Sequence, residues 1–310
     1  MEVADTKTFV IVVTYKGWQW YDRCFQSLRT SSVSIQTIVI DNASDDGSVE
    51  YIQTHFPEIH IIASQSNLGF GQANNKGIRY ALDQGCDYVF LLNQDAWIEK
   101  DSIEKLINVH LANTQFGILS PMQLDPSKSK IERGFLTFVD DYRTTDRAFF
   151  EDGYFGRIKE IYKTSYVNAA AWLLPRSVLT TVGGFDPIFF HYGEDDNYMR
   201  RAVFHGFGIG ICPYSKIVHD CNNKGVRVYS DNEKERRRLL VLLTKLADIT
   251  LPDTWLSTYR YCLKKYLLAL VKGNRRQRQK RKKELQFLKK NKEALRKSRE
   301  RNRIKGETWL

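Results

Sequence analysis

Apolar runs alternate with stretches of helical periodicity along the first third of the chain. Runs rich in β-branched and aromatic residues, typical of buried strands, cover residues 8–15, 35–44, 59–64 and 86–95. Apolar residues recur at helical spacing over residues 18–31, 47–56, 71–85 and 100–113. Strands that alternate with helices in this way predict a mostly parallel sheet with helices on both faces.

The alternation is less regular farther along the chain. Residues 130–160 are polar and aromatic without a clean period, and we interpret them as a long active-site segment or a small subsheet. The pattern then predicts a strand and a helix within 164–186, a helix over 195–207 and a late strand over 208–220. Two amphipathic helices are predicted over 231–271.

The composition is that of a protein that folds around a core. Of the 310 residues, 42% are hydrophobic, and no apolar stretch approaches the roughly 20 residues that span a bilayer. The start has no basic leader, and its apolar run Phe9–Val13 is too short for a signal peptide, so we expect a cytoplasmic protein. Five scattered cysteines without a CxxC pair argue against a disulfide framework or a structural zinc site.

The net charge of +11 is concentrated in one basic tail. Residues 272–305 hold 17 Lys or Arg against three Glu, a net of about +14, which leaves about −3 for the rest. The tail has few helix breakers after Asn274, so a helix is one interpretation, with Leu285, Phe287, Leu288 and Leu295 as its few apolar residues. Three roles are open for it: a solvated, frayed segment, a surface for anionic lipid, or a surface for nucleic acid. Lipid attracts each basic residue by about 1 kcal/mol near the membrane surface. Only Phe287 and Trp309 could stack on bases, which disfavours nucleic acid.

Three of the predicted strands end in polar residues. They lead into Thr14-Tyr15, into the run Asp41–Ser48, and into Asn93-Gln94-Asp95. Turn chemistry explains any one of these ends alone, because Asx and Ser side chains close turns. Ligands of open parallel sheets bind beyond the carboxyl ends of the strands, however, so three such ends on one edge favour a binding site.

The glycines near this edge do not form a dinucleotide-binding fingerprint. Gly69 and Gly71 supply its first two positions, but Asn74 stands where the third glycine belongs. The first strand, which should carry the fingerprint, leads into residues 16–18 instead. We therefore do not expect a nicotinamide dinucleotide.

Three consecutive acids, Glu194, Asp195 and Asp196, stand at the start of a predicted helix. One interpretation is that they complement the helix dipole, for which one or two acids suffice. Like charges this close also raise each other's pKa, which suits a general base.

Four motifs together resemble the family 2 glycosyltransferases, and most of all their bacterial rhamnosyltransferase-like branch. They are VIDNASDDGS, NLGFGQANNKG, LLNQD and FFHYGEDDNYMRR, and the resemblance covers about residues 8–225. It implies an α/β GT-A fold with a Rossmann-like, mostly parallel sheet, here followed by C-terminal helices. It also implies inverting transfer of a sugar from a nucleoside-diphosphate sugar, with Mg²⁺ or Mn²⁺.

The resemblance divides the chain into three parts. Residues 1–230 are the expected GT-A domain, with a nucleotide-sugar-binding half over about 8–117 and an acceptor-binding half over 118–230. Residues 231–271 are a helical extension, and residues 272–310 are the basic tail. We expect the domain to fold without the tail.

The resemblance also assigns the donor and metal contacts. The expected nucleotide-sugar contacts are Thr14, Tyr15, Asp41, Asn42, Ser44, Asn67, Gly69, Asn74 and Asn93. The Asp41 carboxylate can accept the imide N–H of uracil or thymine, which adenine lacks. Asp95 takes the place of the carboxylate that reaches the metal, since Asn93-Gln94-Asp95 replaces the family's usual Asp-x-Asp. His219 is a second ligand or an ordinary structural histidine. Mg²⁺ and Mn²⁺ both favour carboxylate oxygen.

On the acceptor side, the resemblance makes Asp195 the general base for the acceptor hydroxyl. Glu194 would orient Asp195 or bind acceptor hydroxyls. The family has a further acid where this chain has Asn197, which leaves open whether Asp196 substitutes for it. The expected acceptor contacts are Asp186, Trp172 and Asp196.

We therefore expect an inverting glycosyltransferase of cell-surface polysaccharide synthesis. Its expected donor is dTDP-rhamnose or a UDP-sugar, and its expected acceptor is a glycan or a lipid-linked sugar. The basic tail would place it at the inner face of the cell membrane. Two alternatives are an inactive scaffold that binds membrane or nucleic acid, and a nucleotidyltransferase, which would release pyrophosphate.

Overall fold

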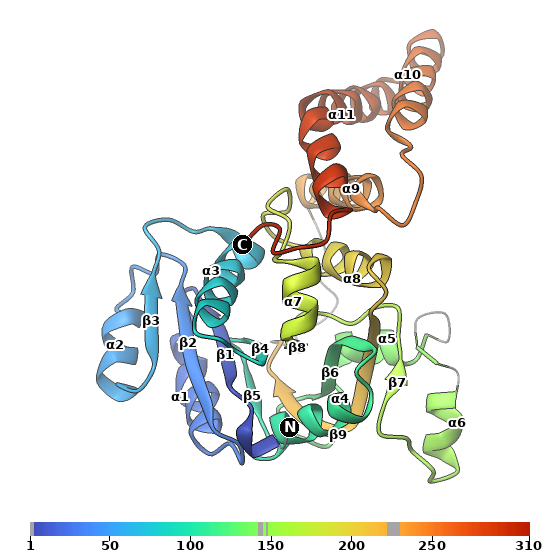
Figure 1. Cartoon of the computed structure of the whole chain (residues 1–310). Helices are drawn as coiled ribbons and strands as arrows, with labels where there is room; N and C mark the ends of the chain where they lie inside the picture. Colours follow the sequence, from blue (N-terminus) through green and yellow to red (C-terminus); the bar gives the residue numbers. More distant parts are fainter. Residues whose placement is uncertain (1–2, 142–144, 147, 222–229) are drawn as a thin grey trace. The chain divides into compact units, whose positions relative to one another are not determined.

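The structure is a computed structural model of the chain, and it describes residues 3–141, 145–146, 148–221 and 230–310. The chain divides into two compact units. Unit 1 comprises Met1–Lys224 and Lys305–Leu310, and unit 2 comprises Gly225–Ile304. All described strands belong to unit 1, whereas the described part of unit 2 is helical (Figure 1). Within the described ranges, every helix is too short or too polar to cross a lipid bilayer.

One mixed sheet forms the centre of unit 1. Its strand order is β3-β2-β1-β4-β8-β6-β9-β5, with β7 paired to β9. The strands are β1 Thr8–Thr14, β2 Ile35–Asp41, β3 His60–Ala63, β4 Tyr88–Asn93, β5 Ala96–Ile98, β6 Phe116–Leu124, β7 Tyr162–Lys163, β8 Ala171–Pro175 and β9 Gly208–His219. Strands β1 to β4 are parallel, as predicted, whereas β8 runs antiparallel to its neighbours β4 and β6.

The register of the parallel strands places three polar strand ends side by side. Thr14 pairs with Asp41 across β1 and β2, and Val13 pairs with Asn93 across β1 and β4. Parallel strands open their carboxyl ends at the same edge of a sheet. The polar segments that follow β1, β2 and β4 therefore start from one edge.

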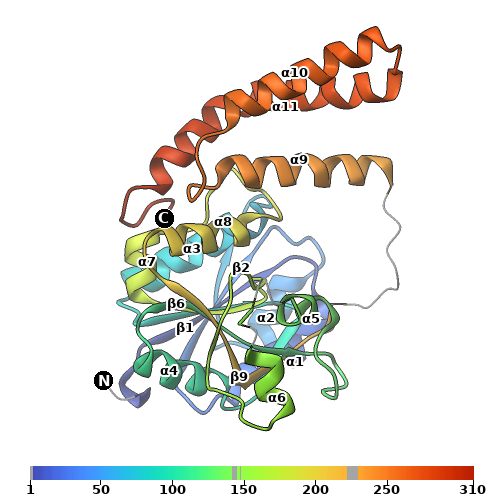
Figure 2. The same cartoon turned by 90° about the vertical axis from the view of Figure 1, so that its right-hand side faces the viewer.

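Helices cover both faces of the sheet (Figure 2). The helices of unit 1 are α1 Trp18–Arg29, α2 Ser48–His55, α3 Gly69–Asp83, α4 Ser102–Ala112, α5 Arg133–Val139, α6 Ala148–Tyr154, α7 Arg176–Val182 and α8 Glu194–Phe204, with a short 3-10 helix at Val3–Asp5. Core residues from α3, α5, α7 and α8 share one face of the sheet with Phe9 and Ile11 of β1. Core residues from α1, α2 and α4 share the other face with Val10 and Val12. Burial on both faces explains why β1 is a continuous apolar run.

Two segments differ from the sequence-based expectation. Phe116–Leu124 is a buried strand, β6, where the pattern predicts none. Pro121 interrupts its apolar run, and the pairing of β6 with β9 shifts register at this proline, as is typical of proline in a sheet. The described part of 130–160 contains the helices α5 and α6 and no subsheet.

Unit 2 consists of three helices in its described residues, α9 Asp231–Ala247, α10 Trp255–Val271 and α11 Arg275–Asn302. The two helices predicted over 231–271 are confirmed. The basic tail is a third helix and not a frayed segment, because α11 packs along α10 and buries Leu288 and Leu295. Trp255 Nε1 also donates to the Leu288 carbonyl at 3.2 Å. The predicted boundary at 271/272 therefore falls inside a helical hairpin.

The last residues of the chain belong to unit 1. Arg201 Nη2 donates to Thr308 Oγ1 at 3.1 Å, and Asn75 Nδ2 donates to the Trp309 carbonyl at 3.0 Å. Gly306 N donates to the Thr181 carbonyl at 2.9 Å. The expectation that residues 1–230 form the domain without the tail therefore needs correction, since unit 1 uses both ends of the chain.

Candidate active site

The Asp41 carboxylate ends β2 and is almost fully buried. Thr14 Oγ1 donates to its Oδ1 at 3.1 Å, and Ser44 N donates to its Oδ2 at 2.9 Å. Ala43 between them has a left-handed φ of 64°, which bends the chain so that the Ser44 amide points back at the carboxylate. Lys16 N donates to Ser44 Oγ at 3.0 Å, so the loops after β1 and β2 are tied together.

Asn42 joins this loop to the start of α3. Leu68 N donates to Asn42 Oδ1 at 2.8 Å, and Asn42 Nδ2 donates to Asn67 Oδ1 at 3.1 Å and to the Gly69 carbonyl at 3.2 Å. A Cβ on Gly69 would lie 1.9 Å from the Phe190 carbonyl oxygen, so the loop before α8 approaches α3 only because position 69 is glycine.

Asn74 is placed differently from the other expected donor contacts. Its side chain is buried, and its Nδ2 donates to the Phe70 carbonyl one turn earlier in α3 at 3.0 Å. The neighbouring Asn75, for which no role is predicted, holds the loop toward α8. Asn75 Oδ1 accepts from Phe185 N at 2.6 Å, and its Nδ2 donates to the Phe185 carbonyl at 2.8 Å.

Asp95 and His219 meet beyond the ends of β4 and β9. Ala96 pairs with His219 across β5 and β9, which places His219 Nε2 3.4 Å from Asp95 Oδ1. His219 Nδ1 lies 3.2 Å from Gln123 Oε1. A proton on Nδ1 would bond Gln123 and leave the Nε2 lone pair facing Asp95. A carboxylate oxygen and an imidazole nitrogen that converge in this way fit a shared divalent cation.

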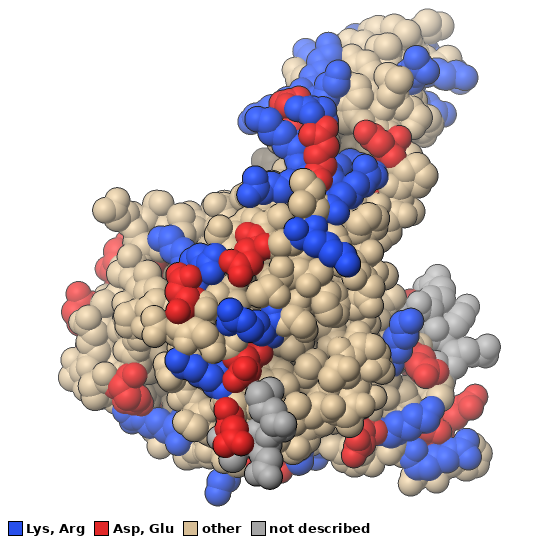
Figure 3. All heavy atoms as spheres, in the orientation of Figure 1, with Lys and Arg blue, Asp and Glu red and all other residues tan. Residues whose placement is uncertain are grey.

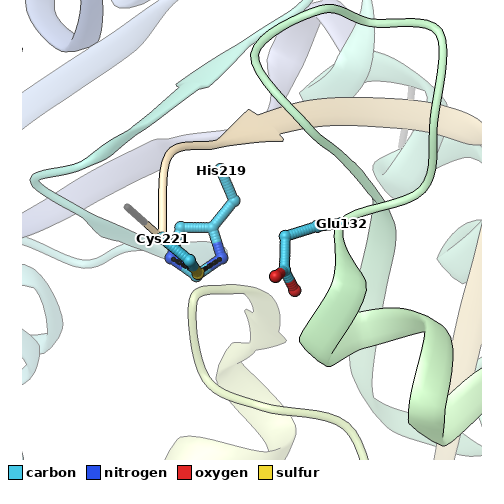
Figure 4. Close-up of side chains that lie close together, drawn as sticks. All are labelled: Glu132, His219 and Cys221. Atoms are coloured by element: carbon cyan, nitrogen blue, oxygen red, sulfur yellow. Dashed lines mark hydrogen bonds between the residues drawn. The ribbon is translucent and has the colours of Figure 1, made fainter. Parts of the chain in front are cut away.

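Two further candidate ligands surround His219. The ligand atoms of Glu132, His219 and Cys221 all lie within 4.8 Å of one another (Figure 4). Both Glu132 oxygens already cap α5, accepting from Gly134 N at 2.8 Å and Phe135 N at 2.7 Å. Partial burial of the sulfur and the nearby Glu132 and Asp95 carboxylates raise the pKa of the Cys221 thiol, which favours its neutral form. Compared with Glu132 and Cys221, Asp95 is therefore better placed to supply an anionic ligand atom beside His219.

Glu194 and Asp195, the first two acids of α8, face largely buried surroundings. Tyr166 Oη donates to Asp195 Oδ2 at 3.0 Å, and Asp196 N donates to Asp195 Oδ1 at 2.8 Å. Burial and the Asp196 charge raise the pKa of Asp195. Burial also raises the pKa of Glu194 to about 7, and its Oε2 has no hydrogen-bond partner among the described residues. Asp195, with two donors, is thus the acid whose ionised form is better supported.

The three expected acceptor contacts lie in different places. Asp196 Oδ1 accepts from Arg200 Nε at 2.8 Å on the surface of α8. Asp186 is buried, and its Oδ1 accepts from Ile188 N at 3.0 Å, which shapes the loop before α8. The assignment of Trp172 to the acceptor is wrong. Its side chain is fully buried on β8, with ring centroids 6.3 Å from Phe185 and 6.0 Å from Tyr198, so it is a core residue.

Sequence reasoning missed the residues that hold the expected ones in place. Gln94 clamps the Tyr15 backbone, accepting from Tyr15 N at 2.9 Å and donating to its carbonyl at 3.2 Å. Gln123, which contacts His219, donates to Asn168 Oδ1 at 2.6 Å. The segment before β8 therefore contacts Asp195 through Tyr166, and it contacts Gln123, the neighbour of His219, through Asn168. The polar alternation Tyr166-Val167-Asn168 was the available signal.

Sequence comparison finds relatives that transfer sugars. A family model described as Glycosyl transferase family 2 matches residues 9–164. The low-salt glycan biosynthesis hexosyltransferase Agl10 of Haloferax volcanii is 26% identical, over 68% of this chain and 66% of that protein. The dTDP-rhamnosyl transferase RfbF of Shigella flexneri is 24% identical, over 63% of each chain. The N-acetylglucosaminyl-diphospho-decaprenol L-rhamnosyltransferase of Mycobacterium tuberculosis is 24% identical, over 68% of this chain and 75% of that protein. The chain thus spans about two thirds of the length of the first two relatives.

Solved structures share the fold. Residues 1–349 of S. aureus TarS, in complex with UDP, superpose with a TM-score of 0.53 at 13% identity, over 80% of this chain and 68% of that chain. The mannosyltransferase PcManGT from Pyrobaculum calidifontis, in complex with GDP-Man and Mn²⁺, gives 0.54 at 17% identity, over 78% and 62%. The predicted GT-A fold is confirmed.

Proposed function

The chain belongs to glycosyl transferase family 2, and from that premise we propose that it moves a sugar from a pyrimidine nucleoside-diphosphate sugar to a hydroxyl of a glycan or lipid-linked acceptor, with inversion. The observation that carries the proposal is that three kinds of group lie around one sheet. Asp41 is a buried carboxylate, and Asp95 and His219 form an oxygen–nitrogen ligand pair. Asp195 is an acid whose carboxylate accepts two hydrogen bonds. These are the groups that base recognition, diphosphate binding and proton removal each require.

The donor would bind along the ends of β1, β2 and β4. Asp41 accepts the imide N–H of the base, while Thr14 and Ser44 keep the carboxylate oriented. The backbone of Tyr15, which Gln94 fixes, borders the same edge. The names of two relatives specify rhamnose, which supports dTDP-rhamnose as the first donor to test.

The diphosphate would lie toward Asp95 and His219. When bound there, Mg²⁺ or Mn²⁺ offsets the charge that develops on the leaving diphosphate. The protein's own contribution is to hold the Asp95 carboxylate and the His219 Nε2 lone pair facing each other, through the strand pairing of β5 with β9 and the Gln123 contact.

Asp195 would act as the general base. The acceptor oxygen attacks the anomeric carbon, the bond from that carbon to the phosphate oxygen breaks with its electron pair, and the acceptor proton passes to the Asp195 carboxylate. Tyr166 and the Asp196 amide fix the carboxylate orientation. Attack opposite to the leaving group inverts the anomeric configuration. An acceptor held on a lipid would bring the reaction to the membrane surface.

A thermal-shift panel tests the donor assignment. The full chain is melted with dTDP, UDP, GDP and ADP, each with Mn²⁺ and with a chelator. A nucleotide at 100 times its Kd adds about 2.7 kcal/mol of stability, and we expect this only for the pyrimidine nucleotides. Asp41→Asn should lose that discrimination. Equal shifts with GDP or ADP would contradict the assigned role of Asp41, and no shift with any nucleotide would contradict the donor site.

A further inference from the structure

The outer face of α10 is apolar and exposed. Four leucines and a valine, which we call the leucine stripe, are between 38% and 87% exposed: Leu256, Leu263, Leu267, Leu270 and Val271. They follow one another at i, i+7, i+11, i+14 and i+15, so they lie on one side of the helix. The buried residues of α10, Cys262 and Ala269, belong to the opposite side. Contiguous exposed apolar side chains of this size mark interaction surfaces.

The charge around the leucine stripe is strongly positive. Unit 2 contains 25 Lys or Arg against eight Asp or Glu, whereas the rest of the chain contains 22 against 28. Exposed Arg260 and Lys264 stand on α10 between the leucines, and Lys272 follows the last residue of the stripe. Lys and Arg also gather on the face of α11 shown in Figure 3. The partner of this surface must therefore accept leucine side chains and also carry negative charge.

We propose that unit 2 docks on an anionic membrane surface, with the leucine stripe inserted at the boundary between headgroups and acyl chains. The long stems of Arg260 and Lys264 can lie along the apolar layer while their charges reach the lipid phosphates. The other basic residues of α10 and α11 add attraction to the surface potential. The proposal concerns where the protein binds and does not depend on the reaction that unit 1 carries out.

The charge argues against the two other occupants of such a face. A second copy would bring two surfaces of the same strong positive sign together, which repel each other. Nucleic acid would satisfy the charge but offers no apolar layer for the leucines. An anionic bilayer satisfies both requirements at once.

The leucine stripe changes the expected response to salt. Attachment by the basic tail through charge alone would be lost at about 1 M salt, where the Debye length is about 3 Å. Inserted leucines do not depend on charge, so part of the binding should survive high salt. The salt-resistant part of the binding therefore reports the leucine stripe, and the salt-sensitive part reports the basic residues.

Vesicle sedimentation with the full-length protein tests the proposal. Binding is measured to phosphatidylglycerol–phosphatidylcholine vesicles and to pure phosphatidylcholine vesicles, at about 0.1 M and 1 M salt. The variants are Leu263→Ser/Leu267→Ser in the stripe and Arg260→Gln/Lys264→Gln beside it. Val203→Ser, a change at an exposed residue of unit 1, is the matched control. Circular dichroism and melting check that each variant folds.

Wild type and Val203→Ser should bind the anionic vesicles and keep a measurable fraction at 1 M salt. The leucine variant should bind at least about tenfold more weakly at low salt and lose the salt-resistant fraction. The charge variant should weaken binding at low salt by several-fold and keep the resistant fraction. A folded leucine variant that binds like wild type would overturn the proposal. Two other results would also overturn it. In one, the wild type does not bind vesicles and is a dimer, which the leucine substitution converts to a monomer. In the other, the wild type binds RNA and no vesicles.

Discussion

The ionisable side chains of the candidate site in unit 1 and the basic side chains beside the leucine stripe in unit 2 are placed in opposite ways. In unit 1, Asp41, Glu194 and His219 are buried, and the contacts that fix such groups come from elements far apart in the sequence. In unit 2, Arg260 and Lys264 are exposed beside apolar side chains that are exposed too. A buried polar side chain with partners from several elements is held in one geometry, which suits chemistry. Exposed basic side chains can adapt their positions to a partner, which suits docking.

The largest expected effect is a loss of catalysis from a single substitution in unit 1. Asp195→Asn should lower kcat by at least about 100-fold, the usual loss for a general base. Nucleotide affinity should stay within about twofold, because the base acts only in the transition state. Steady-state kinetics and calorimetric titration measure the two quantities, with the exposed Asp83→Asn as control. Activity above about a tenth of wild type would remove Asp195 from that role.

The next effect concerns the metal ligands. Asp95→Ala should weaken Mn²⁺-dependent nucleotide binding by at least about tenfold, because it removes the anionic oxygen that faces His219. His219→Ala should weaken it less, since water can partly replace a neutral ligand. Calorimetry with dTDP and UDP, with and without Mn²⁺, measures both. Equal affinity of wild type and Asp95→Ala with the metal present would leave Asp95 as a turn residue only.

A third prediction tests whether the end of the chain belongs to unit 1. Thr308→Ala removes the oxygen that accepts from Arg201, a buried side chain whose pKa burial lowers to about 10. The free energy of unfolding should fall by about 1–3 kcal/mol. For a unit of this size, each kcal/mol lowers Tm by about 2–4 °C. Scanning calorimetry against Lys305→Ala as control measures it. An unchanged Tm would mean that the C-terminal residues do not stabilise unit 1.

The smallest effect is on the pH dependence of kcat. Asp195 must be ionised to act as base, so activity falls as pH drops through its raised pKa. Tyr166→Phe removes a donor that favours the carboxylate, so the acidic limb should move to higher pH. Asp196→Asn removes a repelling charge and keeps the backbone donor, so the limb should move to lower pH. Shifts in the same direction, or none, would contradict the assignment of the limb to Asp195.

The sequence predicted the first half of the fold well because β1, β2 and β4 are buried on both faces and appear as apolar runs. It missed β6, because Pro121 interrupts the pattern and a register shift accommodates it. The expectation that Trp172 contacts the acceptor is wrong, because its place on the central strand β8 makes it a core residue.

The supporting residues of the site were not predictable from local sequence. Gln123 reaches His219 only through the pairing of β6 with β9, and Tyr166 reaches Asp195 only where the segment before β8 meets α8. Such contacts depend on tertiary register. The alternation Tyr166-Val167-Asn168 marks the segment as polar on one side, but it does not identify Asp195 and Gln123 as its partners. The same holds for the C-terminal residues, because the basic composition before them predicts charge and helix but not the return of the chain to unit 1.

The most direct test of the account is donor cleavage by the purified full-length protein, followed by proton NMR. The protein is incubated with dTDP-rhamnose and with UDP-sugars, with Mn²⁺ or with a chelator. We predict metal-dependent release of the nucleoside diphosphate from at least one of these donors. Early spectra should show the anomer of opposite configuration to the donor, and Asp195→Asn should reduce the rate at least about 100-fold. Release of pyrophosphate, retention of the anomeric configuration or no cleavage of any donor would contradict the account.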